Sequence, residues 1–355
     1  MRRPASALSL LLALAMSLGC TGSSADAEPE SGAPGAAVAL TPTIESHVAA
    51  AEAAAGDEHT GLLDRICPQA TSPVPVRGGG GGGGGSQGPP PRSEWYAEPV
   101  RVFDDLVFLG QSEYTAWGVL TSAGIIVIDP IYDWSVEAEV VEGLTSLGLD
   151  PNDIEYVLVS HAHRDHVGGA ALLQERFGAR VVMGEGDWEM LERNTGAWPR
   201  PTRDVVATDG MELTLGETTL KLYVTPGHTP TTISSLVPVR DGESTHLAAL
   251  WGGTAFNFLN NPDEDHERWY QAYIDSAVRF RALAAAAGAD VLISNHSNFD
   301  GSKTKLPALA ARSAGAPHPY VIGNESVGRY LTVAEECGRA GLLYLGANAT
   351  ASTGP

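Results

Sequence analysis

Short apolar runs rich in β-branched residues recur from Val100 onward, and Gly, Pro, Asp and Asn separate them. This pattern is typical of strands joined by turns, and it predicts roughly ten strands. The early runs form hairpin-like pairs, so we expect mixed sheets. The runs are VRVFDDLVFLG, YTAWGVLTSAGIIVID, IEYVLVS, ARVVMG, MELTLG, TTLKLYVT, TTISSLVPV, HLAALW and DVLIS.

Helical patterns alternate with these runs, which makes α/β the predicted fold class. One helix is expected after Trp134, a second from about Val167, and a third around Trp188, whose ring we expect to pack that helix. The last predicted helix is amphipathic and is expected to cover the second sheet. Further helices are expected at 263–287, 306–312 and 326–343.

The N-terminus predicts export from the cytoplasm. A basic start is followed by an apolar run from Ala7 to Gly19, which is shorter than the roughly 20 residues of a membrane span. Residues 1–20 therefore resemble a signal peptide, and Cys20 is the expected lipidation site of a periplasmic or outer-membrane-tethered lipoprotein. Plain secretion is the alternative.

The amino-acid composition predicts which segments outside the expected domain are flexible. Residues 21–44 predict a disordered tether, and 45–68 a short helical segment in which His47 and His59 are solvated. A Gly- and Pro-rich linker is expected at 69–93. The folded domain is then expected at 94–345, with a flexible tail at 346–355.

The net charge limits the kinds of binding partner, and the cysteine content predicts a possible disulfide. The formal net charge is −21, which makes nucleic acid an unfavourable partner but leaves a small-molecule substrate open. A membrane is expected only through the lipid anchor. Cys67 and Cys337 would form a disulfide in an exported protein, with two buried free thiols as the alternative. The sequence leaves the oligomeric state open.

The stretch HAHRDHVGG, from His161 to Gly169, places three imidazoles and a carboxylate within six residues. It directly follows the run IEYVLVS, so His161 and His163 should point the same way from a strand end. Asp165 and His166 come from the turn that follows. Catalytic zinc uses about three protein ligands plus water, so these four donors predict two sites that each lack one ligand.

Two further histidines stand at the ends of predicted strands. TLKLYVT leads into PGHTP, which contains His228, and DVLIS leads into NHS, which contains His296. We therefore expect two ligand groups, His161, His163 and His228 in one, and Asp165, His166 and His296 in the other. The other histidines lack this context: His47, His59, His246, His266 and His318.

Residues 100–313 resemble the metallo-β-lactamase superfamily. The resemblance rests on three motifs that occur in the order and with the spacing of that family: HAHRDH, TPGHTP and the NH after a strand. The resemblance implies a four-layer αββα sandwich of two mixed sheets flanked by helices, with the metals at one edge. Asp129 matches an acid that orients a metal ligand. Many hydrolases of the superfamily have an Asp that bridges both metals at the position of Gly253. Without that bridge, the ligand sets His-His-His and Asp-His-His are similar to those of the third subclass of metallo-β-lactamases.

The expected chemistry is hydrolysis. Two Zn²⁺ per chain would activate a hydroxide that cleaves an amide- or ester-type bond, with the β-lactam ring as one target. Asp165 is the expected catalytic residue, because it both ligates and can orient the water. The alternatives are a hydrolase of thiolesters or lactones, and a zinc-binding lipoprotein without catalysis. The presence of all six ligands argues against the last of these.

Residues near the expected metal edge are candidates for substrate contact. Thr254 is the nearest equivalent of a serine that helps to hold the substrate carboxylate in the third subclass, and Tyr223 could donate to an oxyanion. Core packing is the alternative for each aromatic residue. The full set is Thr254, Trp251, Tyr223, Trp117, Asn257 and Ser297, with Tyr114, Phe256 and Asn298 as further neighbours.

Overall fold

The computed structural model describes residues 41–72 and 89–352. The predicted signal peptide, Cys20, the tether before residue 41 and most of the predicted linker lie outside these residues. None of the helices described is long and apolar enough to cross a membrane. Residues from Pro42 to the C-terminus form one compact unit.

The first sheet has seven strands in the order β1-β2-β3-β4-β5-β6-β7. The pairs from β1 to β4 are antiparallel, and those from β4 to β7 are parallel, so the sheet is mixed as predicted. Only β7, a three-residue strand, has no counterpart among the predicted runs. The strands are β1 Val100–Phe103, β2 Leu106–Phe108, β3 Trp117–Thr121, β4 Gly124–Ile128, β5 Ile154–Leu158, β6 Arg180–Gly184 and β7 Val205–Ala207.

The second sheet has five strands in the order β12-β11-β10-β9-β8. All its pairs are antiparallel except β11 with β12, which is the strand that delivers the last predicted histidine. The strands are β8 Glu212–Leu215, β9 Thr218–Val224, β10 Ile233–Asp241, β11 Ser244–Leu250 and β12 Val291–Ile293.

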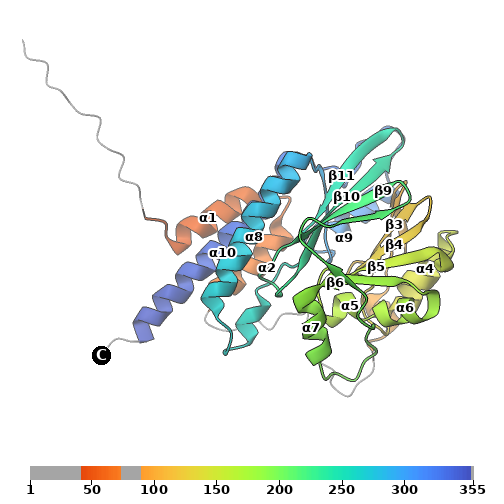
Figure 1. Cartoon of the computed structure of the whole chain (residues 1–355). Coiled ribbons are helices and arrows are strands. Elements are labelled where there is room, and N and C mark those ends of the chain that lie inside the picture. Colours follow the sequence, from red (N-terminus) through yellow and green to blue (C-terminus); the bar gives the residue numbers. More distant parts are fainter. Residues whose placement is uncertain (1–40, 73–88, 353–355) are drawn as a thin grey trace, which may run out of the picture. The chain divides into compact units, whose positions relative to one another are not determined.

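Helices cover the outer face of each sheet, which confirms the predicted αββα sandwich (Figure 1). One apolar core lies between the sheets, and a second lies beneath the helices of the first sheet. That layer comprises the π-helical turn η1 Glu137–Val141, α4 Glu142–Ser146, α5 Arg164–Val167, α6 Ala170–Phe177 and α7 Glu185–Arg193. Short elements elsewhere are α3 Arg92–Trp95, η2 Pro151–Asp153, η3 Asn257–Asn260 and α9 Ser302–Ala310.

The second sheet carries a thicker helical layer. Helix α8 (His266–Ala287) and helix α10 (Asn324–Ser352) share an apolar core with β10, β11 and β12, so α10 covers this sheet as predicted. Helix α10 is longer than expected: residues 346–352, predicted as a flexible tail, continue the helix.

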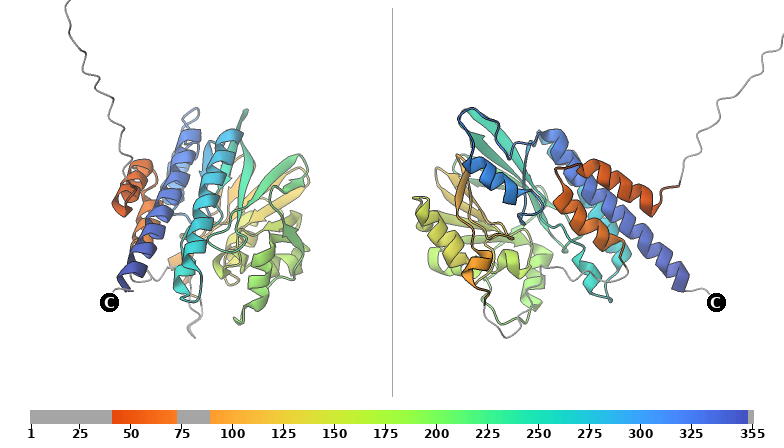
Figure 2. Two further views of the ribbon diagram at one scale, coloured as in Figure 1. Left: turned by 60° about the vertical axis from the view of Figure 1, so that its left-hand side comes forward. Right: turned by 180° about the vertical axis from the view of Figure 1, so that it is seen from behind.

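The N-terminal helical segment also belongs to this layer. It consists of α1 (Ile44–Ala55) and α2 (Thr60–Ala70), which lie against α10 in both views of Figure 2. A disulfide joins Cys67 in α2 to Cys337 in α10. The prediction of a solvated His59 is wrong, because the ring is 2 % exposed and lies 2.9 Å from the carbonyl oxygen of Ser326. Both helices are thus part of the folded body.

Glu139 provides a test of the first helical layer. Its side chain is fully buried, and only one carboxyl oxygen accepts a hydrogen bond, from the backbone N–H of Ala97. Burial raises its pKa from 4.5 to about 8. The folded protein therefore keeps the proton up to about pH 8, whereas the unfolded chain loses it above about pH 4.5, so stability falls as the pH rises through this interval.

We expect Glu139→Gln to raise the melting temperature at pH 8.5 by about 4 °C or more, because the amide mimics the protonated carboxyl. At pH 4.5 the variant and the wild type should melt together. Thermal unfolding across the pH range measures this, with exposed Glu137→Gln as the control. A stability difference that does not change with pH would contradict the assignment.

Candidate metal centre

The strand-to-helix corner after β5 holds four of the predicted ligands. Strand β5 ends at Leu158, the chain bends between Ser160 and His163, and the single turn of α5 then begins. Backbone N–H groups of His166 and Val167 bond to the carbonyl oxygen of His163, which closes the turn. This corner directs His161 and His163 to one side and Asp165 and His166 to the other.

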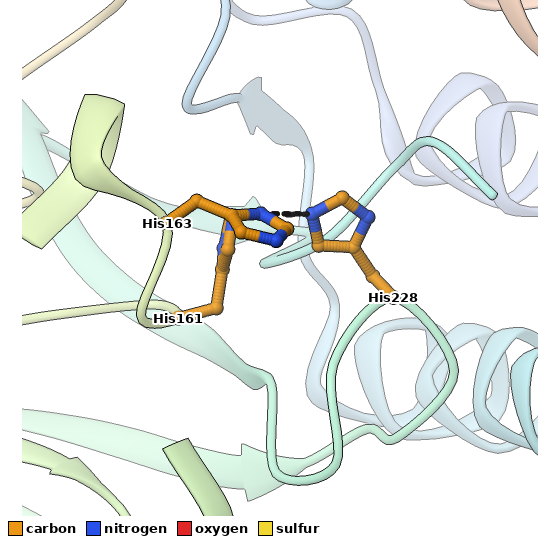
Figure 3. Close-up of side chains that lie close together, drawn as sticks. All are labelled: His161, His163 and His228. Carbon is orange, nitrogen blue, oxygen red and sulfur yellow. Dashed lines mark hydrogen bonds between the residues drawn. The ribbon is translucent and has the colours of Figure 1, made fainter. Parts of the chain in front are cut away.

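His161, His163 and His228 converge as the first group (Figure 3). The Nε2 atom of His228 lies 3.1 Å from Nδ1 of His163 and 3.1 Å from Nε2 of His161. The rings stand nearly perpendicular to one another, at 82° and 89° to the His228 plane. Three nitrogens from two loops therefore face one point.

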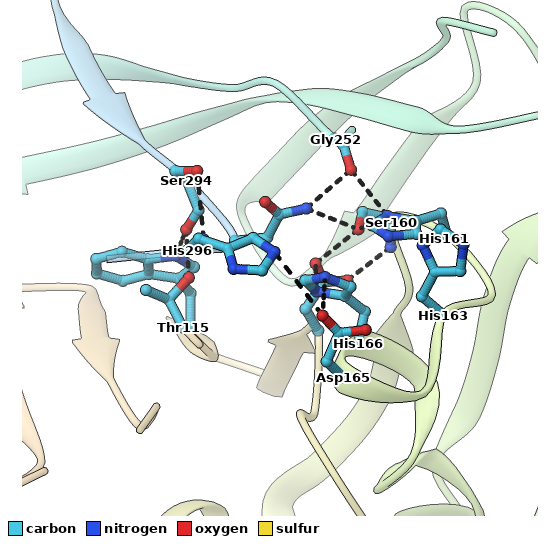
Figure 4. A network of polar contacts seen from close by, with 12 residues as sticks. Thr115, Ser160, His161, His163, Asp165, His166, Gly252, Ser294 and His296 are labelled. Carbon is cyan, nitrogen blue, oxygen red and sulfur yellow. Dashed lines mark hydrogen bonds and ion pairs between the residues drawn. The ribbon is translucent and has the colours of Figure 1, made fainter. Parts of the chain in front are cut away.

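Asp165, His166 and His296 form the second group (Figure 4). The Oδ2 atom of Asp165 lies 3.4 Å from Nε2 of His166 and 3.9 Å from Nε2 of His296. In each group the three donor atoms lie within 4.8 Å of one another. The structure thus assembles the six side chains into the two groups expected from the sequence.

The outward-facing nitrogens of three rings are held by oxygen atoms. His161 Nδ1 lies 2.9 Å from the carbonyl oxygen of Gly252, and His228 Nδ1 lies 2.5 Å from that of Ala255. His166 Nδ1 lies 3.1 Å from a carboxylate oxygen of Asp129. Such partners fix the tautomer and turn the other nitrogen towards a metal. The expected role of Asp129 agrees with this position.

Asp129 also ties two strands together at the site. Its carboxylate accepts hydrogen bonds of 2.6 Å from both the backbone N–H and the hydroxyl of Ser160. Asp129 has a φ of 52°, a left-handed conformation that few non-glycine residues adopt. This backbone turn directs the carboxylate back towards the corner that carries the ligands.

The electrostatics favour neutral imidazoles in the first group. Burial holds the pKa of His161 and of His228 well below the ordinary value, and neighbouring imidazoles act in the same direction. Burial also lowers the pKa of His296, to about 3. Burial opposes a charged His166, but the carboxylates of Asp165 and Asp129 outweigh it and raise its pKa to about 10. Neutral imidazoles are the form that binds metals.

The donor sets fit metal ions. In a tetrahedral zinc site with bonds of about 2.0–2.1 Å, ligand nitrogens stand roughly 3.3–3.4 Å apart. The 3.1 Å separations in the first group are close to this value. In the second group, Oδ1 of Asp165 is buried with no hydrogen-bond partner among the described residues. Three imidazoles, and two imidazoles with a carboxylate, are both donor sets typical of zinc.

Gly253 has no room for the missing bridging carboxylate. A Cβ added there would lie 2.4 Å from Cβ and 2.7 Å from Cγ of His228. Neighbouring Gly252 is equally crowded, since its added Cβ would lie 1.9 Å from the carbonyl oxygen of Ile233. Any side chain at either position would displace a ligand loop or a strand.

Comparisons with known proteins agree with this arrangement. Residues 113–241 match the family model of the metallo-β-lactamase superfamily. The fold matches BJP-1, a subclass B3 metallo-β-lactamase of Bradyrhizobium japonicum, with a TM-score of 0.59 and 27 % identity over 73 % of this chain and 97 % of that one. Over residues 113–241 the chain matches the metallo-β-lactamase superfamily, and its fold is similar to that of a subclass B3 metallo-β-lactamase.

Other relatives in the superfamily are more distant or named for a different reaction. Native FEZ-1 metallo-β-lactamase from Legionella gormanii shares the fold, with a TM-score of 0.58 at 20 % identity over 73 % of this chain and 98 % of its own. A hydroxyacylglutathione hydrolase from Acidiphilium cryptum is 26 % identical over 57 % of this chain and 78 % of its own. With both ligand groups in place and these similarities, the protein is a metal-dependent hydrolase.

A cavity of about 440 Å³ opens over both ligand groups. Two of the predicted substrate-contact residues, Thr254 and Asn257, line it, as do Tyr114 and Asn298. The cavity is also lined by Gly61, Asp64 and Arg65 of α2, a helix whose place beside the cavity could not be predicted from the sequence.

Five of the substrate-contact candidates do not line this cavity. Trp117 and Trp251 are buried in the cores, and the indole N–H of Trp117 donates to the carbonyl oxygen of Ser294. Tyr223 packs beside Phe280. The Ser297 hydroxyl donates to the carbonyl oxygen of Ser112 and faces away from the metal cavity. Phe256 is likewise in the core. These four aromatic side chains therefore pack against the apolar cores and not in the cavity wall.

Asp187 is a functional residue that the sequence analysis missed. It is fully buried in the first turn of α7, beside the predicted packing residue Trp188, which is indeed in the core. Its carboxylate accepts hydrogen bonds from the backbone N–H of Ala162 and from the hydroxyl of Thr229. Thr231 donates its N–H and its hydroxyl. One carboxylate therefore connects the His161–His163 loop to the His228 loop.

We expect Asp187→Ala to weaken metal binding at the first group about 10- to 100-fold, the usual effect of losing a residue that orients ligands. The two loops would lose their common acceptor, so the three imidazoles would no longer be held on one point. Competition with a chromogenic chelator measures the affinity. Asp133→Ala, in a carboxylate paired with Arg164 outside both groups, is the control. Equal affinity in the Asp187 variant and the wild type would refute this role.

Proposed function

We propose that the protein is an exported zinc-dependent hydrolase with two zinc ions per chain, and that the β-lactam ring is its substrate. The observation that carries this proposal is the pair of complete ligand groups beside a Gly253 that leaves no space for a bridging carboxylate. The likeness to a subclass B3 metallo-β-lactamase at 27 % identity supports the choice of substrate.

Zinc held by these residues supplies a coordinated water whose pKa falls to about 7 and an electrophile for the scissile carbonyl. Residues of the chain would transfer the proton and contact the substrate. The Oδ1 atom of Asp165 has no hydrogen-bond partner within the described part of the chain, so it can accept a proton from the attacking water and pass it to the leaving group. Thr254 and Asn257, at the cavity wall, are placed to contact the substrate.

A thiolester is the second candidate substrate. The support is the Acidiphilium cryptum relative, which is named as a hydroxyacylglutathione hydrolase. The crowding at Gly253 favours the β-lactam over this candidate, because many superfamily hydrolases of other substrates carry an Asp at that place.

Two features support export. The first is the leader predicted at residues 1–20, with Cys20 as the lipid attachment site. The second is the Cys67–Cys337 disulfide, since disulfides persist mainly in oxidising compartments. Metabolic labelling with a radioactive fatty acid tests the anchor: label in the wild type and none in Cys20→Ala would support it. An unlabelled wild type found in the medium would point to plain secretion.

The reaction can be tested directly. The purified protein is assayed for metal content and for turnover of a chromogenic β-lactam, a thiolester and a lactone, with His163→Ala as the inactive control. Two zincs and β-lactam turnover that His163→Ala abolishes are expected. Turnover of the thiolester alone would favour the second candidate. Metal without any turnover would indicate a binding protein, and less than one metal per chain would refute the metal centre.

A further inference from the structure

We propose that α2 is a wall of the active-site cavity and that Arg65 on this helix binds an anionic group of the substrate, a carboxylate. The proposal rests on the proposed hydrolase function for its reaction but does not depend on which bond is cleaved. It gives a substrate-binding role to a helix that precedes the part of the chain matched by the family model, residues 113–241.

Three residues of α2 share one face of the helix. Gly61, Arg65 and Gln69 follow one another at intervals of four residues, so their side chains lie along one stripe. The two outer residues fasten this stripe to loops around the metal centre. Arg65 lies between them and lines the cavity.

Gly61 sits against the loop that carries His296. A Cβ added to Gly61 would lie 2.1 Å from the carbonyl oxygen of Asn298, two residues after His296. Only glycine allows this approach of the helix to the loop. The N-terminal end of α2 is therefore in backbone contact with the second ligand group's loop.

Gln69 binds the opposite loop. Its side-chain oxygen accepts from the backbone N–H of Phe256 at 3.0 Å, and its side-chain amide donates to the carbonyl oxygen of Phe256 at 3.2 Å. Phe256 lies between Thr254 and Asn257, which both line the cavity. The amide of Gln69 is buried, so this bidentate contact fixes the helix to the loop.

Arg65 is the only Arg or Lys among the described residues that line the cavity. It is half-buried, and no ion pair joins it to a described acidic residue, although most arginines of the described chain have one. Of the acids at the cavity, Glu113 is paired with Lys303, and Asp165 belongs to the second ligand group. Asp64 is exposed.

A guanidinium in this position fits a carboxylate. Its planar donors bind two carboxylate oxygens at once, and such a charge-assisted contact is stronger in a cavity than in open water. The two flanking anchors hold the helix, so the side chain is presented to a substrate already placed over the metal groups. A substrate whose carboxylate is masked as an ester would lose this contact.

The kinetic test compares Arg65→Gln and Arg65→Lys with the wild type on a matched substrate pair, a free carboxylic acid and its methyl ester. The pair is made from the chromogenic β-lactam or, if only thiolesters are cleaved, from an acyl thiolester. We expect Arg65→Gln to raise KM for the acid about 10- to 100-fold with kcat nearly unchanged. Arg65→Lys should recover part of the loss, and KM for the ester should not change.

A binding measurement separates this proposal from the proposed function. The ring-opened β-lactam, a dicarboxylate, and its diester are titrated by calorimetry into the wild type as purified, Arg65→Gln and the surface control Arg193→Gln. A dissociation constant for the dicarboxylate that rises at least tenfold only in Arg65→Gln supports the proposal, even if no substrate is turned over. Equal dicarboxylate binding in all three proteins, or an equal loss for acid and ester, would overturn it while leaving the hydrolase function intact.

Discussion

Replacing Asp165 with Asn is expected to reduce kcat by roughly 10³-fold, the range of a lost general base. One carboxylate oxygen of Asp165 lies near both His166 and His296, while none of the residues that the structure describes makes a hydrogen bond to the other oxygen. The amide keeps the size of the side chain but loses the charge that binds a metal and the basicity that accepts a proton. Both losses fall on the second ligand group alone.

The first ligand group should survive this substitution, because its three imidazoles are held by Gly252, Ala255 and the loop contacts of Asp187. Metal analysis should therefore find about one ion per chain in Asp165→Asn, together with an unchanged circular dichroism spectrum. Asp133→Asn makes the same chemical change nearby in an acid paired with Arg164, and it should remain active. Wild-type kcat in Asp165→Asn would remove this residue from the reaction.

The six ligand side chains could be predicted because each depends on local structure. A buried strand ends at a known residue, and the side chain that follows it lies at the sheet edge whatever packs elsewhere. His228 and His296 are predicted in this way, each a few residues after a run of apolar residues. The sequence also shows that position 253 is Gly and not the usual Asp. Only the structure shows why a side chain cannot fit there, because it would clash with His228.

Residues whose role depends on distant packing could not be predicted. Asp187 looks like an ordinary solvated acid in the first turn of a helix, and only the tertiary structure brings three hydrogen-bonding residues of two loops to it. For Trp117 and Trp251, the direction of the side chain could not be predicted. Their positions near the metal edge were right, but alternation along a strand does not say whether an aromatic ring faces a cavity or the core.

Helix α2 is the largest difference between sequence and structure. Its apolar residues Leu62 and Ile66 predict one buried face, but the sequence does not name the surface that buries it. The Gly- and Pro-rich stretch that follows, residues 69–93, predicts a flexible linker between this helix and the folded domain. In the structure that face packs against α10, and the opposite end of the chain supplies the cysteine that fixes it there.

Replacing both Cys67 and Cys337 with Ser is expected to lower the free energy of unfolding by about 2–5 kcal/mol. The disulfide joins residues 270 positions apart, so it removes much of the freedom that the unfolded chain would otherwise have. Both cysteines are buried, and two hydroxyls in their place would face apolar surroundings without the bond. Chemical denaturation of the oxidised wild type and the double variant measures the difference.

The same variant tests whether the disulfide matters to the active site. The contacts of Gly61 and Gln69 place Arg65, and the disulfide adds a covalent attachment of α2 to α10. Loosening this attachment should raise KM for a carboxylate substrate. Metal content should stay constant, because no ligand comes from α2. A reducing agent should lower the stability of the wild type towards that of the variant and leave the variant unaffected. Equal stability of the two proteins under oxidising conditions would show that packing of α1 and α2 against α10 suffices without the covalent link.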